Sequence, residues 1–136
     1  MRIRFLTLCV LAFLSLCGTK ERYSVSDSLL NAIQSVESGD AGDNAPDGDG
    51  GKAIGPFQIR KEYWKDATEF DKTIGGTYAD CHKLEYATKV VRAYMRRYVP
   101  VGSTDETAAR IHNGGPKGAT KKATEKYWEK VKKALK

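Results

Sequence analysis

The sequence predicts a single α+β domain that is mostly helical, with a small β-hairpin element beside a helical bundle. Three observations support this fold class. Apolar residues recur at helical spacing in several segments, Gly and Asp crowd residues 40–51, and only one cysteine, Cys81, lies outside residues 1–18. Because a lone cysteine cannot form an internal disulfide, helix packing has to stabilise the domain.

Residues 1–18 are expected to be a secretory signal peptide. Met1 to Arg4 is short and basic, and 5–16 is an unbroken apolar run too short to span a membrane. A lipid-modified Cys17 and a retained apolar segment remain alternatives, because no clean cleavage signature precedes Gly18. We therefore expect a secreted protein with one domain over residues 19–136.

Four apolar residues on one helical stripe predict the first helix: Val25, Leu29, Ile33 and Val36. Ser24 or Ser26 can cap its start, and Gly39 suits its end. The Gly- and Asp-rich residues 40–51 are predicted to be a loop or hairpin turn.

A short apolar run from Ala53 to Ile59, interrupted by Gly55 and Pro56, predicts a small β-ribbon. Residues 61–70 are predicted to form a short helix, which a Gly-Gly pair at 75–76 follows.

The longest periodic segment, residues 78 to about 98, is predicted to be the central buried helix. Its apolar positions recur at helical spacing: Leu84, Ala87, Val91, Tyr94 and Tyr98. Pro100 ends this helix.

Two further helices are predicted near the C-terminus. Ser103 and Glu106 have the spacing of a capping box, which would open a helix that stops at residues 113–116. The last helix is predicted over residues 120–135 and would bury Tyr127 and Val131.

Positive charge gathers at the C-terminal end. From Lys117 to Lys136 there are eight lysines against Glu125 and Glu129, whereas residues 19–116 carry a net charge near −2. A basic end favours anionic partners such as wall polymers, acidic lipid or nucleic acid. A solvated lysine face on a terminal helix is the alternative interpretation.

One carboxylate stands where the first helix is expected to end, in Val36-Glu37-Ser38-Gly39. Apolar surface from Val36 and Ile33 would keep the Glu37 carboxyl protonated, as a glycoside hydrolase requires of its general acid. The alternative is a solvated glutamate, which the C-terminal end of a helix dipole would disfavour.

A second carboxylate is expected from the loop that holds Asp43, Asp47 and Asp49. We choose Asp49, because its glycine neighbours leave it wet and ionised and allow close approach of a substrate. Asp47 is the second choice. Turn formation and a calcium loop are alternatives, although a calcium loop would require a distal glutamate that this spacing lacks.

The chain resembles the invertebrate-type (destabilase-type) lysozymes, as a cysteine-poor member. The matching segments occur in family order: 36–39, 55–59, 63–66, 94–98, 110–118 and 127–128. The resemblance implies a lysozyme-like fold and assigns the acid role to Glu37. The animal members' disulfide cysteines are replaced here: Ala32, Asp40, Ile54, Ala67, Val90 and Ala119 occupy such positions.

Four further residues are expected to bind substrate. Gln58 resembles the strand residue on the cleft floor, and Tyr63 could stack on a sugar face. His112 and Asn113 precede a Gly-Gly break that suits a cleft wall. No paired His or His–Cys spacing indicates a metal, and no cofactor is expected.

The sequence therefore predicts a secreted, monomeric muramidase that hydrolyses the β-1,4 bond of bacterial peptidoglycan with Glu37 and Asp49, about 5 Å apart in a retaining mechanism. No nucleic acid partner is expected. A lytic transglycosylase and a non-enzymatic cationic protein that binds walls or membranes are the alternatives. An isopeptidase side activity lacks a convincing Ser–His pair in the sequence.

Overall fold

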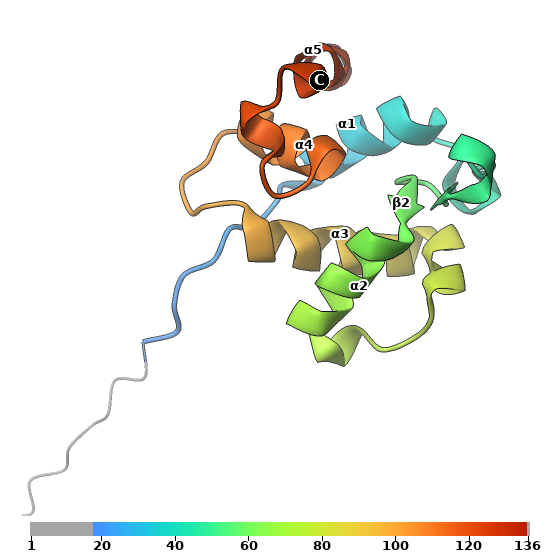
Figure 1. Cartoon of the computed structure of the whole chain (residues 1–136), viewed down its shortest axis with the longest axis horizontal. Helices are drawn as coiled ribbons and strands as arrows, with labels where there is room; N and C mark the ends of the chain where they lie inside the picture. Colours follow the sequence, from blue (N-terminus) through green and yellow to red (C-terminus); the bar gives the residue numbers. More distant parts are fainter. Residues whose placement is uncertain (1–17, 136) are drawn as a thin grey trace, which may run out of the picture.

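Five α-helices and a two-stranded ribbon form the structure, a computed structural model that describes residues 18–135 (Figure 1). The helices are α1 (Asp27–Ser38), α2 (Lys61–Phe70), α3 (Leu84–Tyr98), α4 (Asp105–Gly114) and α5 (Glu125–Ala134). Strands β1 (Ala53–Ile54) and β2 (Ile59–Arg60) pair antiparallel, with Ile54 opposite Ile59. The predicted fold class, mostly helical with a small β-element, is confirmed.

Six short 3₁₀ turns connect these elements: η1 (Gly42–Asn44), η2 (Asp49–Gly51), η3 (Lys72–Ile74), η4 (Tyr78–His82), η5 (Gly118–Thr120) and η6 (Lys122–Thr124). The predicted signal peptide, apart from Gly18, and the question of Cys17 lie outside the described residues. Within residues 18–135, no helix is both long and apolar enough to cross a bilayer.

Helix α3 crosses the middle of the molecule (Figure 1). Helices α1, α4 and α5 contact one another on one side of it, and α2 packs on the other. The ribbon lies at one end, close to the C-terminal end of α1. This arrangement brings the ends of α1 and α4 toward the ribbon and α2.

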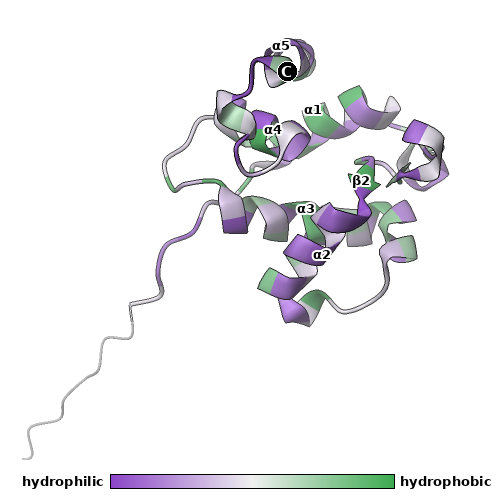
Figure 2. Ribbon diagram, viewed as in Figure 1, coloured by the Kyte–Doolittle hydropathy of each residue, from purple (hydrophilic) through white to green (hydrophobic). Residues whose placement is uncertain are grey.

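The core is built largely around α3. Its fully buried side chains include Ala87, Val90, Val91, Ala93 and Met95. Figure 2 shows that apolar residues turn toward the inside of the helical body and polar residues toward solvent. The prediction of a central buried helix is confirmed.

Apolar side chains fill most positions at which the resemblance places disulfide cysteines in animal members. Ala32, Ile54, Ala67 and Val90 are all buried, with 4% or less of their surface exposed. Cys81 is also buried and has a free thiol, whose pKa burial raises to about 12. Apolar packing therefore stabilises these positions without cross-links.

The first helix has the predicted caps. The Ser26 hydroxyl accepts a hydrogen bond from the Leu29 amide at 3.1 Å, and Gly39 ends the helix with a left-handed φ of 62°. Glycine adopts this conformation without steric cost. The local sequence thus fixes where α1 ends, directly after Glu37.

The predicted helix over residues 78–98 is wrong at its start. Thr77 and Asp80 form a capping box on the 3₁₀ turn η4, and Lys83 is extended with ψ 127°. Helix α3 begins only at Leu84, whose amide donates to the Asp43 carboxylate at 2.7 Å. A side chain 41 residues away caps this helix, so the local pattern could not reveal its start.

Two other helix starts also differ from the prediction. Helix α4 is capped by Thr104, which accepts from the Thr107 amide at 3.2 Å, and not by a Ser103–Glu106 box. The predicted helix over 120–135 begins at Glu125, after two 3₁₀ turns. The Thr124 hydroxyl holds these turns by donating to the Gly118 carbonyl at 2.7 Å.

Gly55 is the residue whose replacement should most disturb the ribbon. Its φ is +71°, and an added Cβ would lie 1.9 Å from the Cys81 carbonyl oxygen. We expect Gly55→Ala to cost about 3 kcal/mol or more, the sum of left-handed strain and overpacking. Gly102→Ala is the control, because Gly102 has a φ of +79° with nothing within 4 Å of an added Cβ. Urea unfolding measures the free energy of unfolding of both variants. A larger loss in Gly55→Ala than in Gly102→Ala would show the cost of the clash, and equal losses would contradict it.

Candidate active site

A cavity of about 450 Å³ lies where α1, the ribbon, α2, α3 and α4 meet. Five of the six predicted site residues line it: Glu37, Gln58, Tyr63, His112 and Asn113. Asp49 does not line the cavity, but it forms an ion pair with Arg60, and Arg60 is a lining residue. The cavity therefore contains the candidate acid, with the candidate second carboxylate at its edge.

Glu37 lies in the last turn of α1, and a neighbouring residue fixes this turn against the ribbon. The Ser38 hydroxyl contacts the Pro56 carbonyl oxygen at 2.9 Å and the Gln34 carbonyl oxygen at 3.3 Å. The end of α1 is thus attached to the segment between β1 and β2. This contact sets the position of Glu37 relative to the loop that holds Asp49.

Two side chains converge on one oxygen of the Glu37 carboxyl. The Tyr127 hydroxyl donates to Oε1 at 2.8 Å, and His112 Nε2 lies 3.6 Å from the same atom. The Glu37 side chain is 18% exposed and that of His112 only 4%. Among residues 18–135, no hydrogen bond to Oε2 is present, and Glu37 lines the cavity.

A buried chain of polar groups extends behind Glu37. The Tyr63 hydroxyl lies 2.9 Å from His112 Nδ1. Burial raises the pKa of both Tyr127 and Tyr63 well above the usual value, assisted by Glu37 at Tyr127 and by Tyr94 and then Glu37 at Tyr63, so both hydroxyls stay protonated. Tyr63 then donates to Nδ1, and we infer that His112 carries its proton on Nε2, facing Glu37.

Tyr63 lines the cavity, but much of its ring is engaged within the protein. It stacks on Tyr94 with ring centres 3.6 Å apart and planes 12° apart. The neighbouring Trp64 donates to the Tyr86 hydroxyl at 3.0 Å. One face and the hydroxyl of Tyr63 are therefore occupied, which leaves only its remaining surface for a sugar.

The three loop aspartates considered for the second carboxylate, Asp43, Asp47 and Asp49, have different partners. Asp43 caps α3, and Asp47 contacts His82 Nε2 at 2.8 Å, so both are directed toward the η4–α3 region. Asp49 pairs with Arg60 at the edge of the cavity, and both side chains are about half exposed. An exposed pair of this kind contributes little stability and separates readily.

Asp49 and Gln58 both have left-handed backbone conformations, with φ 50° and 48°. Such residues are uncommon and cluster at functional sites, where the surrounding fold maintains the strain. The Gln58 amide donates to the carbonyls of Pro46 and Gly55 at 3.0 and 2.9 Å, which braces the loop against the ribbon. The amide oxygen of Gln58 faces Gly48, where an added Cβ would lie 2.1 Å from it, so the amide group is engaged within the protein.

The Asp47–His82 pair predicts a pH-dependent contribution to stability. A hydrogen bond to the Ala79 carbonyl, followed by contact with Asp47, raises the His82 pKa. A raised histidine pKa stabilises the fold below the unfolded value, about 6.5, and this contribution disappears as pH rises through the folded value. We expect Asp47→Asn to lower Tm more at pH 5.5 than at pH 8.5. Because the pair is exposed, the free energy of unfolding should differ between the two pH values by about 1 kcal/mol at most. An equal loss at both pH values would contradict this assignment.

Sequence reasoning missed several residues that complete the site. Tyr127 was expected only to be buried, and it lies 90 residues from its partner Glu37. Arg60, Glu62, Asp66 and Tyr94 also line the cavity. A tyrosine on the buried face of a terminal helix resembles any core tyrosine, so no local signal distinguishes Tyr127.

Tyr127→Phe is expected to lower kcat about 10-fold, the effect of losing one hydrogen bond to a group that becomes charged during turnover. KM should change little, because the lost contact faces Glu37 and not the cavity. Tyr86→Phe is the control, since its hydroxyl also makes a short hydrogen bond, to the Gly75 carbonyl, but lies outside the cavity lining. A kcat that falls equally in both variants would contradict a specific role for Tyr127.

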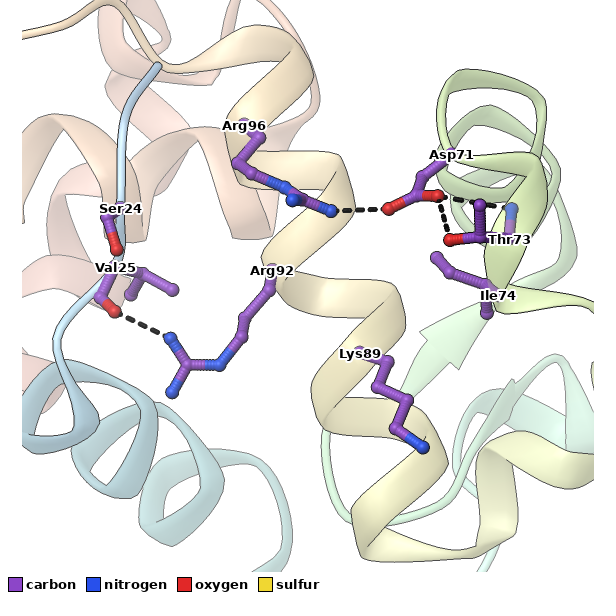
Figure 3. Close-up of a pocket in the computed structure, with 8 residues that line it drawn as sticks. All are labelled: Ser24, Val25, Asp71, Thr73, Ile74, Lys89, Arg92 and Arg96. Carbon is purple, nitrogen blue, oxygen red and sulfur yellow. Dashed lines mark hydrogen bonds and ion pairs between the residues drawn. The ribbon is translucent and has the colours of Figure 1, made fainter. Parts of the chain in front are cut away.

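A second cavity, of about 420 Å³, lies beside the opposite face of α3 (Figure 3). Three cations on α3 line it: Lys89, Arg92 and Arg96. Each pairs with a carboxylate of the protein, Glu85, Asp27 and Asp71 respectively. The pairs with Asp27 and Asp71 fasten the start of α1 and the start of η3 to α3, whereas the Lys89–Glu85 pair lies within α3. We interpret the cavity as structural.

The part of the chain that the structure describes shows no cluster of metal-ligating side chains. No group of three His, Cys, Asp or Glu side chains there is close enough together to hold a metal ion.

Comparison with known proteins agrees with this geometry. The Destabilase family model matches residues 26–134. The lysozyme of Ostrea edulis is 38% identical over 130 residues, 90% of each chain. The crystal structure of Tapes japonica lysozyme is 33% identical with a TM-score of 0.67, and covers 79% of this chain and 89% of that one.

A further similar structure is that of Meretrix lusoria lysozyme in complex with Aeromonas hydrophila PliI. It is 34% identical, with a TM-score of 0.67 over 80% of this chain and 89% of that chain. The Destabilase match over residues 26–134 includes Glu37 and its partners Tyr127 and His112. The chain therefore belongs to the destabilase family of invertebrate-type lysozymes and is a glycoside hydrolase of the muramidase class.

Proposed function

We propose that this chain cleaves the β-1,4 bond between N-acetylmuramic acid and N-acetylglucosamine in bacterial peptidoglycan, with Glu37 as general acid and Asp49 as second carboxylate. One observation carries the proposal. Tyr127 and His112 both approach Oε1 of Glu37, whereas Oε2 accepts no hydrogen bond from any described residue, and Glu37 lines a cavity of about 450 Å³. A cavity of this size suits part of a glycan chain.

The hydrogen-bond pattern supports a proposal for the position of the acidic proton. In a protonated carboxyl the carbonyl oxygen accepts hydrogen bonds, and the hydroxyl oxygen donates one. With Oε1 accepting from Tyr127, the proton belongs on Oε2, and from there it can pass to the glycosidic oxygen. When the C–O bond breaks, Tyr127 and His112 stabilise the carboxylate that remains.

Asp49 would compensate the positive charge that develops on the sugar, either by forming a covalent bond to it or by electrostatic stabilisation. Arg60 balances the Asp49 charge before substrate enters. Since both side chains are about half exposed, the pair can separate at small cost when the glycan binds. Glu37, now ionised, would then accept a proton from the attacking water.

A lytic transglycosylase is the second candidate, and the position of Asp49 outside the cavity lining favours it. Such an enzyme would use Glu37 alone and form an anhydro-sugar. Mass analysis of fragments released from purified peptidoglycan distinguishes the two, with Glu37→Gln as the inactive control. Fragments with a reducing N-acetylmuramic acid end support the hydrolase, and anhydro ends overturn it.

We also propose that the protein is secreted and acts as a monomer, in antibacterial defence or digestion. The basic residues and apolar run at the N-terminus support secretion. The lysine-rich C-terminal end would add a contact with an anionic surface. Detection of the mature protein in culture medium, and its mass in solution, test these points.

A further inference from the structure

Within residues 18–135, five of the six arginines form ion pairs, whereas Lys89 is the only lysine that does. Arg60, Arg92, Arg96, Arg97 and Arg110 each form an ion pair with a carboxylate of the protein. The seven lysines between Lys117 and Lys133 form none with any described residue, and neither do Glu125 and Glu129 beside them. This C-terminal segment therefore carries a net charge of +5 without ion pairs to described residues, although Lys121 donates to the Gly114 carbonyl at 2.6 Å.

Three of these lysines form a row along α5. Lys126, Lys130 and Lys133 are spaced i, i+4 and i+7, so they lie on one helical stripe, and all three are exposed. The row extends about 10 Å along the helix axis. Like charges at this spacing destabilise a helix, and a ligand with repeated negative charges would relieve that repulsion.

The opposite side of α5 is occupied by the fold. Val131 is fully buried, and Tyr127 and Trp128 pack against the core. Helix α5 contacts α1 and α4, and its outer surface is polar (Figure 2). A helix that binds at a membrane interface needs a free apolar face, and α5 has none. Single-stranded nucleic acid would require exposed aromatic residues, and both aromatics of α5 are partly buried within the fold.

The chemistry of lysine narrows the partner further. Lysine is a compact point charge on a flexible stem, which suits phosphate groups in a mobile chain, whereas planar carboxylates favour the fork of arginine. We propose that Lys126, Lys130 and Lys133 bind a linear phosphodiester polymer of the bacterial wall and so retain the enzyme on its substrate. This inference rests on the proposed function only in its choice of a wall polymer.

The test compares two triple variants with the same change in charge. Lys126, Lys130 and Lys133 are replaced by glutamine in one, and the exposed Lys65, Lys72 and Lys83 in the other. Cosedimentation with purified Gram-positive walls measures binding before and after acid extraction of the phosphodiester polymer. We expect the α5 variant to bind intact walls at least 10-fold more weakly, with a salt slope reduced by about two to three, and the control within 2-fold of wild type.

Each other outcome overturns the inference. Equal losses in both variants would indicate a response to net charge alone. Undiminished wild-type binding to extracted walls would place recognition on the glycan, and equally tight binding to anionic lipid vesicles or duplex DNA would remove the preference for the polymer. Hydrolysis of a soluble, uncharged N-acetylglucosamine oligomer is measured in parallel. Its absence in wild type would contradict the proposed function without affecting the binding result.

Discussion

Glu37→Gln is expected to lower kcat about 10³-fold on purified peptidoglycan, which corresponds to about 4 kcal/mol of lost transition-state stabilisation. Glutamine keeps the shape of the side chain, and its amide oxygen can still accept the Tyr127 hydrogen bond. It has no proton to give to the leaving oxygen. Binding to walls should therefore persist while turnover is lost.

The control for this experiment is Glu85→Gln, which removes an exposed carboxylate paired with Lys89. Its kcat should match wild type within 2-fold, because exposed pairs contribute little. The salt dependence of cell lysis distinguishes enzymatic lysis from lysis by charge-driven binding alone. If Glu37→Gln still lyses cells and raised salt abolishes that lysis, charge-driven binding explains the activity and the proposed chemistry is wrong.

Asp49→Asn is expected to lower kcat by about 10²-fold, because it removes a charge that would stabilise the developing cation. Asparagine tolerates the left-handed backbone at this position, where φ is 50°, so the fold should persist. Asp47→Asn is the matched control, two residues away in the same loop. Since Asp47 contacts His82 and not the cavity edge, its kcat should stay within 2-fold of wild type.

Product analysis of the two aspartate variants adds a second reading. If Asp49→Asn retains full kcat and wild type yields anhydro-sugars, Glu37 acts alone and the enzyme is a transglycosylase. A larger loss in Asp47→Asn than in Asp49→Asn would move the second carboxylate to Asp47. Circular dichroism at the assay pH shows whether a variant is folded, so a loss of activity is read only from folded protein.

Local patterns predicted much of the fold. Helices α1 and α2 occur where their periodicity and end signals place them, and the ribbon flanks Gly55 and Pro56. These features depend on contacts within about four residues, which the sequence displays directly. The predicted starts of α3 and α5 were wrong because contacts between distant residues set them. Asp43 caps α3 from 41 residues away, and Thr124, bonded to Arg110 on α4, holds the turns before α5.

The candidate site also contains residues that the local sequence predicts and residues that only tertiary packing brings together. Glu37 could be selected from the sequence because a carboxylate at the end of an amphipathic helix is unusual. Its partner Tyr127 could not, because the two residues are 90 positions apart and meet only when α5 packs on α1. The stacking of Tyr63 on Tyr94, which limits its contact with a sugar, is likewise a product of α2 packing on α3.

The sequence alone determined the helical character of this protein, the excess of lysine at its end and the acid at the end of α1, since spacing and composition are properties of the chain itself. Only the tertiary structure decided which oxygen of Glu37 accepts a hydrogen bond, and which partner each loop aspartate takes. Those choices depend on side chains from distant elements meeting at fixed distances, and a linear pattern does not contain such distances.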